Sequence, residues 1–420
     1  MVVPFIKLFN TPNSAYFLDV NKNEIIPISE EAHNYLNEVM SGRQAWDALR
    51  LPELADLQDQ GYLTTESNVV KILHNNTKYL ETYLNRNLSK LTLQLTQSCN
   101  LRCKYCVYSE TVNDRQRRHS TKSMDWNTAK KAIDFLWARS IDSNELYLSY
   151  YGGEPFLEFE LIKQCVEYSK KLFSGKQIYF NITTNGTLLT DEHIYYSEKN
   201  DISLMISLDG PKEIHDRNRV FENGSGTYDT VIETIERIKK IAPKCVEKLY
   251  ISMVVNPEED FDCVNSVFFD GDELDQVKLQ HSMVDFGYDN IEITSSEEYR
   301  WKSEYQNFIA LLAYYNRYPE DEVSPLALNI LRIDVNDYNK IEQMEKLHET
   351  DAPSGPCVPG HSRLLVDVEG RLFPCERAGE RNIAAYAHRV YRSRVRYGKR
   401  QQFFKRWPDI GKGMPGLLVF

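Results

Sequence analysis

The chain has 420 residues, of which 42% are hydrophobic and 12% aromatic, enough to bury a large core and to divide into about two to four domains. Its net charge of −11 argues against nucleic acid as the main partner, because the acidic residues are spread along the chain. No apolar run reaches the roughly 18 residues that span a bilayer, and the N-terminus lacks a secretory signal, so we expect a cytoplasmic protein without a membrane partner.

Residues 1–65 predict a small winged-helix-like module. The run AYFLDVNKNEIIPIS is typical of two short strands joined by a polar turn. Ser29 offers an N-cap to a helix with one apolar face. That face consists of Ala32, Tyr35, Leu36, Val39 and Met40. A second helix is expected from Leu51 to Gln60, and Tyr62 with Leu63 is expected to begin a returning strand.

A linker and a connecting helix are predicted for residues 66–90, and an α/β repeat follows in residues 91–295. Strands are expected at Leu91–Leu95, Leu146–Tyr151, Ile178–Ile182, Leu204–Leu208 and Leu249–Val255. Helices are expected at about 125–139, 158–172, 190–199 and 227–241. Near-continuous apolar strands alternating with helices indicate a parallel sheet or barrel.

The run TLQLTQSCNLRCKYC places three cysteines directly after the first of these strands. Cys99, Cys103 and Cys106 have C-x3-C-x2-C spacing, which indicates a [4Fe-4S] site. Three thiolates on four irons leave one iron open to a small molecule. The alternatives are a zinc knuckle, which needs a fourth ligand close by, and three free thiols.

The ends of the next three strands carry residues suited to ligand binding. Gly152-Gly153-Glu154-Pro155 closes one strand, Thr184-Asn185-Gly186 the next and Ser207-Leu208-Asp209-Gly210-Pro211 the third. Because the carboxyl ends of parallel strands meet at one edge, we expect these side chains to converge with the cysteines. His215 is interpreted as a surface residue at a helix start.

Residues 296–350 are predicted to be a mainly helical bridge. Its core positions are expected at Phe308, Leu311, Leu312 and Tyr315. Cys357 and Cys375 then frame LLVDVEGRLF, which predicts a strand, a turn and a strand. No cysteine follows Cys375. The remaining cysteines, Cys165, Cys245 and Cys263, are expected to be free buried thiols.

These motifs together resemble the radical S-adenosylmethionine (SAM) enzymes, with Tyr105 just inside the last cysteine as a further point of likeness. The resemblance implies a partial (β/α)6 barrel in which SAM chelates the fourth iron and is cleaved by one electron to a radical that abstracts hydrogen. It implies that the GGEP loop holds the SAM amine, that Ser207 lies near the ribose and that Arg219 contacts SAM. The implied cofactor-binding residues are Tyr105, Gly152, Gly153, Glu154, Asn185, Ser207 and Arg219.

The C-terminal region resembles the opening of a SPASM domain, an extension that carries auxiliary [4Fe-4S] clusters. The likeness covers residues 351–380 and would make Cys357 and Cys375 metal ligands. An auxiliary cluster would be absent or incomplete here, because the further cysteines of that domain are missing. Residues 381–420 hold ten Lys or Arg against the single acid Asp409, a net of +9, whereas residues 1–380 carry 40 basic and 60 acidic residues, a net of −20. Our hypothesis is that this atypical basic tail is not the family's own C-terminus, as after a reading-frame change.

The opening PFIKLFNTPNSAYFLDVNKNEI and the run LQLTQSCNLRCKYC are most similar to maturases of cysteine-rich peptides, which join a cysteine sulfur to a substrate carbon as a thioether. Residues 1–65 would recognise the leader of a precursor peptide, and a flavodoxin or ferredoxin would supply electrons. One alternative is an anaerobic sulfatase-maturating enzyme, although Glu376 stands where that branch has an Asp proton acceptor. The other is an iron–sulfur DNA-binding sensor, which residues 1–65 do not favour because they lack a dense Lys/Arg face.

Overall fold

The computed structural model resolves the chain into two compact units. Of the described residues, one unit contains those up to Tyr79 together with Thr350–Asp351, and the other contains those from Leu80 to Tyr338 and from 362 to 376. The structure describes residues 3–67, 71–72, 79–106, 119–259, 261–266, 274, 277–284, 295–338, 350–351 and 362–376. The predictions for Cys357 and for the tail 381–420 lie outside the described residues, as do parts of the predicted linker and of region 351–380.

The first unit begins with a three-stranded antiparallel sheet in the order β1-β2-β3. The elements are β1 (Ile6–Thr11), β2 (Ser14–Asp19), β3 (Glu24–Ile28), α1 (Glu30–Met40), η1 (Ala48–Arg50) and α2 (Pro52–Asp59). Ser29 caps α1 as predicted, since its hydroxyl accepts a hydrogen bond from the Ala32 amide at 3.1 Å. Phe17, Leu36 and Leu54 are fully buried in the core of this unit.

Two details of this unit differ from the prediction. Strand β1 was not expected, and Tyr62 and Leu63 do not form a strand. Leu63 has a φ of 57°, a left-handed conformation that is incompatible with an extended strand. Its amide donates to the buried Asp19 carboxylate at 3.0 Å, so the chain turns here instead of returning along the sheet. A short strand β4 (Lys71–Ile72) pairs with β11 (Thr350–Asp351) farther along the chain.

The second unit contains an open eight-stranded sheet in the order β10-β9-β8-β7-β6-β5-β12-β13. Strands β5 (Lys90–Thr96), β6 (Glu145–Gly152), β7 (Gln177–Thr184), β8 (Ile202–Ser207), β9 (Leu249–Val255) and β10 (Lys278–Met283) are parallel. The sheet has two ends, so the barrel is partial, as predicted.

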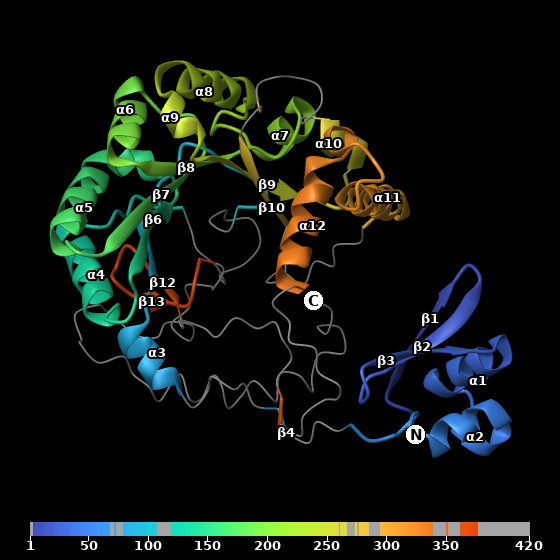
Figure 1. Ribbon diagram of the computed structural model, residues 1–420. Helices are drawn as coiled ribbons and strands as arrows, with labels where there is room; N and C mark the ends of the chain where they lie inside the picture. The colour runs from blue at the N-terminus through green and yellow to red at the C-terminus, as the bar shows by residue number, and fades with distance from the viewer. Residues whose placement is uncertain are drawn as a thin grey trace. The chain divides into compact units, whose positions relative to one another are not determined.

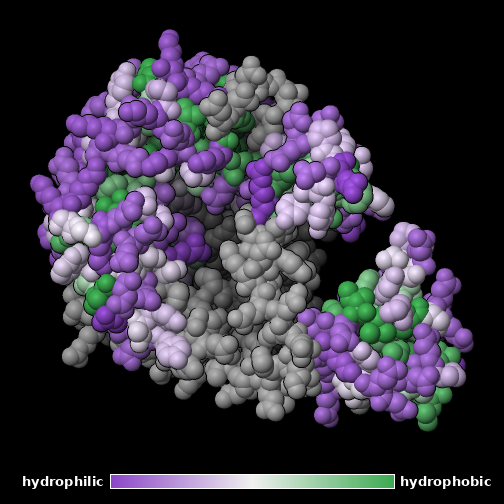
Figure 2. Space-filling view, viewed as in Figure 1, coloured by the Kyte–Doolittle hydropathy of each residue, from purple (hydrophilic) through white to green (hydrophobic). Residues whose placement is uncertain are grey.

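Helices accompany this sheet. They are α3 (Leu80–Arg86), α4 (Trp126–Arg139), α5 (Phe159–Leu172), α6 (Asp191–Asn200), α7 (Lys212–Asn218), α8 (Tyr228–Ile241), α9 (Pro243–Val246) and α10 (Phe261–Ser266). Among them, α4, α5, α6 and α8 lie where the sequence predicts helices. In Figure 1, α4, α5, α6 and α8 lie along the outside of the curved sheet. Their outer surfaces are largely hydrophilic (Figure 2). Strand β10, the short helices α7, α9 and α10, and the 3-10 turn η3 (Pro155–Glu158) were not predicted.

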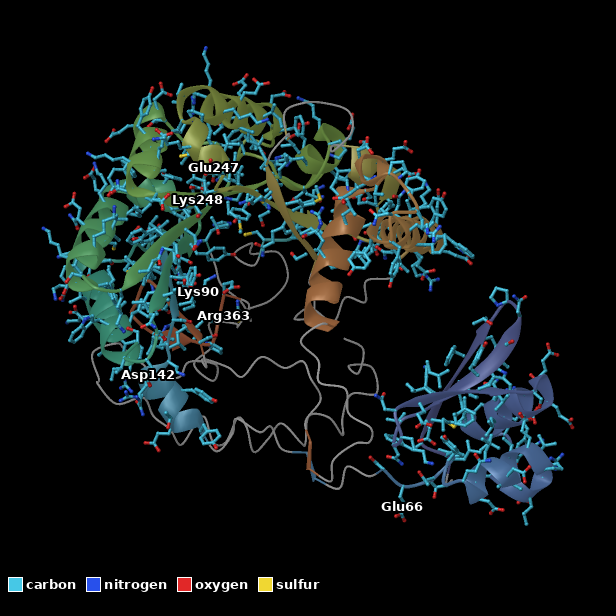
Figure 3. All side chains as sticks on the ribbon, in the orientation of Figure 1. Glu66, Lys90, Asp142, Glu247, Lys248 and Arg363 are labelled. Atoms are coloured by element: carbon cyan, nitrogen blue, oxygen red, sulfur yellow. The ribbon has the colours of Figure 1, made fainter. Side chains whose placement is uncertain are left out.

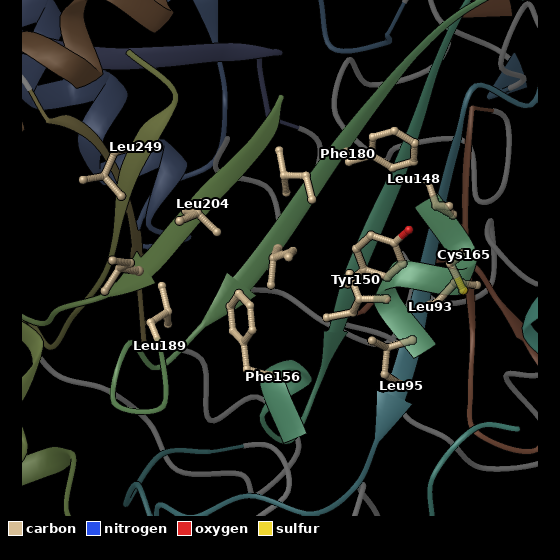
Figure 4. Packing of buried hydrophobic residues seen from close by; sticks show 14 of the residues in the cluster. Leu93, Leu95, Leu148, Tyr150, Phe156, Cys165, Phe180, Leu189, Leu204 and Leu249 are labelled. Carbon is tan, nitrogen blue, oxygen red and sulfur yellow. The ribbon is translucent and has the colours of Figure 1, made fainter. Parts of the chain in front are cut away.

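The core of the second unit lies between the sheet and these helices. Leu93, Leu148, Phe180 and Leu204 from four adjacent strands are buried there (Figure 4). Cys165 is fully buried in the same core, Cys245 is buried and Cys263 is half-buried. The expectation of a buried thiol therefore holds for Cys165 and Cys245 and is wrong for the half-buried Cys263.

The predicted strand, turn and strand around Gly370 exist as β12 (Arg363–Val366) and β13 (Leu372–Phe373). They are not a separate layer, because β12 pairs in parallel with β5 and so extends the main sheet. Arg363 lies opposite Lys90 in this pairing (Figure 3). The turn forms around the buried Asp367, which accepts hydrogen bonds from the Glu369 and Arg371 amides at 3.0 and 2.7 Å.

The helical bridge consists of α11 (Glu297–Tyr314), the turn η4 (Glu320–Glu322) and α12 (Pro325–Tyr338). The predicted core face of α11 is wrong at three of its four positions, since Phe308, Leu311 and Tyr315 are exposed and Leu312 is only partly buried. The buried residues of α11 are Tyr299, Ile309, Ala310 and Ala313. Among the helices of the described residues, none has the length and apolar character needed to cross a membrane.

Candidate active site

The three cysteines lie in the loop that follows β5, at the carboxyl end of that strand. Cys103 is buried, whereas Cys99 and Cys106 are half-buried. Burial raises the pKa of Cys99 to about 12 and that of Cys103 to about 11. These thiols are therefore protonated at neutral pH in the metal-free chain, and metal binding must displace their protons.

Donor groups surround two of the three sulfurs. Sγ of Cys99 accepts from the Leu101 amide at 3.4 Å and lies 3.8 Å from Nδ2 of Asn185. Sγ of Cys103 lies 4.0 Å from Nη1 of Arg219. Amide and guanidinium donors stabilise thiolate sulfur, because they favour its charged form. These donors would stabilise the two sulfurs as thiolate ligands of a metal.

The three thiols fit a [4Fe-4S] cluster with one iron left open. Within the described part of the chain, no three His, Cys, Asp or Glu side chains converge on one ion, as a zinc site would require. A four-iron cluster gives each thiolate its own iron, so its ligands need not converge on a point. Cys99, Cys103 and Cys106 would each hold one iron.

The glycine pair at the end of β6 packs directly against the cysteine loop. The Gly153 amide donates to the Thr96 carbonyl at 2.8 Å, and the Glu154 amide donates to the Ser98 carbonyl at 2.9 Å. A Cβ atom on Gly153 would lie 2.0 Å from the Ser98 oxygen, and one on Gly152, whose φ is 141°, would lie 2.4 Å from the Thr96 oxygen. Only glycine permits this approach of two backbones.

The Glu154 side chain ties this loop to the end of β7. Its carboxylate is fully buried and accepts from the Thr184 hydroxyl at 2.8 Å, the Asn185 amide at 2.8 Å and the Phe156 amide at 3.1 Å. Burial raises its pKa to about 7, against the effect of these hydrogen bonds. The side chain expected to receive the SAM amine is thus enclosed by donors of its own chain.

Asn185 links the end of β7 to the cysteine loop. Its Nδ2 donates to Oδ1 of Asn100 at 2.8 Å, and its Oδ1 accepts from the Thr187 amide at 2.9 Å. The Thr187 hydroxyl in turn accepts from Nδ2 of Asn100 at 2.8 Å. Ser207, at the end of β8, is nearly buried, and its hydroxyl has no hydrogen-bond partner among the described residues.

A buried network that the sequence analysis missed is centred on Asp209. The hydroxyl of Tyr105 and Nε of Arg219 both donate to its Oδ2, the latter at 2.8 Å. The Val254 amide donates to Oδ1 at 3.1 Å. The predicted residues Tyr105 and Arg219 are therefore brought together with Cys103, and the residue that joins them comes from the SLDGP run itself.

His215 belongs to this network, so its interpretation as a surface residue is wrong. Its side chain is fully buried. Burial and the nearby Arg219 lower its pKa to about 4, so the ring is neutral at pH 7. Nδ1 accepts from the Asp209 amide at 3.2 Å, which leaves the proton on Nε2, 2.9 Å from the Thr227 hydroxyl. Its place six residues after Asp209 was a signal for this role.

The segment after α7 also holds the cysteine loop through its backbone. The Arg102 amide donates to the Val220 carbonyl at 2.8 Å, and the Lys104 amide donates to the Asn218 carbonyl at 3.0 Å. Nη2 of Arg102 forms an ion pair with Glu222 at 2.9 Å. The loop that carries the cysteines is thus fixed from two sides.

Of the two C-terminal cysteines, only Cys375 lies within the described residues. It is half-buried and free, just after β13. Glu376 lies 3.7 Å from Arg363 in an ion pair. Neither residue touches the cysteine loop through any contact described here, so the auxiliary cluster stays a prediction.

Residues 93–269 match the Radical SAM superfamily. A cysteine-type anaerobic sulfatase-maturating enzyme of Clostridium novyi is 27% identical over 157 residues, 37% of this chain and 41% of that protein. The radical SAM cyclopropyl synthase TigE of Paramaledivibacter caminithermalis is 26% identical over 190 residues, 40% of this chain and 39% of that protein. A solved structure of native anSMEcpe with bound AdoMet and Kp18Cys peptide has a TM-score of 0.55 at 19% identity, covering 75% of this chain and 82% of that chain.

The chain spans between about a third and a half of the length of the curated relatives it matches. The region of likeness contains the cysteine loop, the glycine pair and the Asp209 network. Enzymes of this superfamily use a [4Fe-4S] cluster and SAM, and the residues found at the carboxyl ends of β5 to β8 fit both. Residues 93–269 are therefore a radical SAM domain, in the α/β fold of that superfamily.

Proposed function

We propose that this protein is a radical SAM enzyme that modifies a ribosomally made cysteine-rich precursor peptide by forming a thioether between a cysteine sulfur and a carbon. The observation that carries the proposal is the convergence of two strand ends and of the end of α7 on the cysteine loop. Gly153 reaches it through the backbone, Asn185 through Cys99 and Arg219 through Cys103. When bound, the cluster and SAM supply one-electron cleavage and hydrogen abstraction.

Different residues of the chain would hold the cluster and the parts of SAM. Cys99, Cys103 and Cys106 would hold the cluster. Arg219 would bind the SAM carboxylate, and the free hydroxyl of Ser207 would meet the ribose. Since the Glu154 carboxylate is already satisfied, we assign the contact with the SAM amine to the backbone carbonyls of the glycine pair and give Glu154 the task of fixing that loop.

The first unit supports a peptide substrate. Its sheet has two outer strands, β1 and β3, neither of which pairs with a further strand among the described residues. An extended leader peptide could add to such an edge through backbone hydrogen bonds, with side-chain pockets giving specificity. Radical SAM domains similar to this one occur in maturases and in a structure with a bound peptide.

The second candidate is anaerobic sulfatase maturation, which the likeness to the Clostridium novyi enzyme favours. Against it, Glu376 stands in place of the expected Asp and is engaged by Arg363. A leader-binding unit also has no evident task when the substrate is a sulfatase. A DNA-binding sensor is the weakest alternative, because sensing does not require residues arranged to bind SAM.

The cellular setting follows from the proposed chemistry. An iron–sulfur cluster and free thiols fit the reducing cytoplasm. Reductive cleavage needs an electron donor, for which we propose a flavodoxin or ferredoxin.

The substrate is tested with the products of the neighbouring reading frames. A small cysteine-rich peptide, incubated anaerobically with the reconstituted enzyme and SAM, should lose two hydrogens per thioether and one alkylatable thiol per bond formed. Mass spectrometry measures both. Conversion of cysteine to formylglycine in a sulfatase-derived peptide, with no change in the cysteine-rich one, would favour the second candidate instead.

A further inference from the structure

We propose that Asp209 is a positioning residue that fixes Arg219 and Tyr105 beside Cys103 and thereby sets the affinity of the site for SAM. The inference rests on the proposed function for the identity of the ligand. The family resemblance implies contacts with SAM for Ser207 and Arg219 but gives no role to Asp209, which lies between them.

The Asp209 carboxylate joins three separate elements. Its donors are the hydroxyl of Tyr105 in the cysteine loop, Nε of Arg219 at the end of α7 and the amide of Val254 in β9. The side chain of Asp209 is fully buried and that of Arg219 is 10% exposed. A buried carboxylate that receives three hydrogen bonds, one from a guanidinium, holds its partners in a defined geometry.

The consequence for Arg219 is a fixed orientation. With Nε bound to Asp209, the planar guanidinium lies with its carbon 5.3 Å from the centre of the Tyr105 ring and Nη1 4.0 Å from Sγ of Cys103. Among the described residues Nη2 has no hydrogen-bond partner. The second nitrogen is thus free to bind the carboxylate of a ligand at the iron that the cysteines leave open.

Both ends of the segment between Asp209 and Arg219 are anchored as well. The Asp209 amide donates to His215, and the Thr227 hydroxyl donates to the Arg219 carbonyl at 3.1 Å. Because that hydroxyl also meets Nε2 of His215, one histidine and one threonine hold the backbone on which the ion pair stands. The backbone at both ends of the Asp209–Arg219 ion pair is therefore fixed by hydrogen bonds to His215 and Thr227.

A second buried pair in the same unit supplies a matched control. Asp367 is fully buried, binds Nε of Arg371 and accepts backbone amide hydrogen bonds, as Asp209 does. It lies in the β12–β13 turn and has no contact with the cysteine loop among the interactions described. Asp367→Asn and Asp209→Asn remove the same charge from similar surroundings.

The test compares these two variants in the anaerobically reconstituted full-length protein. We expect Asp209→Asn to keep about four irons but to raise the Kd for SAM at least about tenfold, since a hydrogen-bonded charge pair is disrupted. The EPR spectrum of the reduced cluster should change both with and without SAM. Asp367→Asn should lower the Tm as much or more, yet leave the Kd and the spectrum unchanged. A Kd within about twofold of wild type for Asp209→Asn would overturn the inference.

Further variants keep the result interpretable. In an Arg219→Lys background, Asp209→Asn should have little additional effect on the Kd, because both act through one interaction; full additivity contradicts the inference. If Asp209→Asn does not fold, Tyr105→Phe, which removes one donor, should still change the EPR spectrum. If the wild-type protein holds the cluster but does not bind SAM, the proposed function is refuted while the positioning role of Asp209 can still be tested. The spectra of the Asp209→Asn and Asp367→Asn proteins would then decide the positioning role, and identical spectra would reject it.

Discussion

At the residue scale, His215 gives the clearest dependence on pH. Its pKa of about 4 in the folded chain lies below the ordinary value of 6.5. Between these values the unfolded chain binds a proton that the folded chain does not, so folding stability falls as pH falls from 6.5 to 4. At pH 5 the free energy of unfolding should be about 2 kcal/mol lower than at pH 7 because of this residue alone.

His215→Asn should remove this part of the pH dependence. The Asn Oδ1 still offers an acceptor to the Asp209 amide, so the turn is preserved. The measurement is the Tm of both proteins at pH 7 and pH 5. An equal fall in Tm on acidification in the two proteins would show that His215 titrates normally.

Gly153 tests the close packing of the glycine pair on the cysteine loop. Gly153→Ala would place a Cβ atom 2.0 Å from the Ser98 carbonyl oxygen, so the backbone of the loop must shift. We expect iron content after reconstitution to fall by at least half. Gly175→Ala is the control: its φ of 96° makes alanine strained there, but no atom lies within 4 Å of the added Cβ. The change is therefore confined to the turn after α5, and this variant should retain its iron.

At the element scale, the N-terminus of α1 depends on Ser29. Its hydroxyl caps the helix and donates to Glu53 in α2 at 2.5 Å. Ser29→Ala should destabilise the first unit by about 1 kcal/mol. Hydrogen exchange of the α1 amides should then be about fivefold faster in the full chain. The exposed Ser14→Ala serves as control, and equal exchange in both variants would contradict the role of the cap.

The helices and strands that were predicted correctly are those whose signal lies within one segment of the sequence. Helices α4, α5, α6 and α8 are predictable because the apolar periodicity of each lies within one segment. The exposed face of α11 was misjudged, because periodicity identifies an apolar stripe but not which stripe meets a neighbour. Strand β1 pairs with the adjacent β2, but only its Ile6 is buried, so its segment carries no clear apolar alternation. The pairing of β12 with β5 depends on a partner distant in the chain, which a single segment does not reveal.

In the candidate site too, some residues can be predicted from one segment of the sequence, whereas the roles of others depend on the fold. The spacing of the cysteines and the place after strands of the glycine pair, Asn185 and Ser207 predict a site there. Arg219 and the contact of Ser207 with SAM follow only from the family resemblance. The roles of Asp209 and His215 were not predicted, because they follow from burial and from hydrogen bonds between three elements. Glu154 was found, but its partners in β7 were not, since only the folded sheet brings the two strand ends together.

At the scale of the whole molecule, the number of clusters remains a prediction. The two C-terminal cysteines supply only half the protein ligands of an auxiliary cluster, and a partly ligated cluster is easily lost. Cys357→Ser should therefore change the iron content little, and SAM cleavage should persist. Iron and sulfide analysis with Mössbauer spectra checks this. Eight or more irons per chain would mean that other ligands complete a second cluster.

The central claim is that Cys99, Cys103 and Cys106 hold a cluster that works with SAM. The most direct measurement is the yield of 5'-deoxyadenosine from SAM and a strong reductant, with the iron content, for wild type, Cys103→Ser and the control Cys263→Ser. We predict about four irons and steady cleavage for wild type and control, and loss of cleavage with reduced iron for Cys103→Ser. Unchanged iron and unchanged 5'-deoxyadenosine in Cys103→Ser would contradict the account.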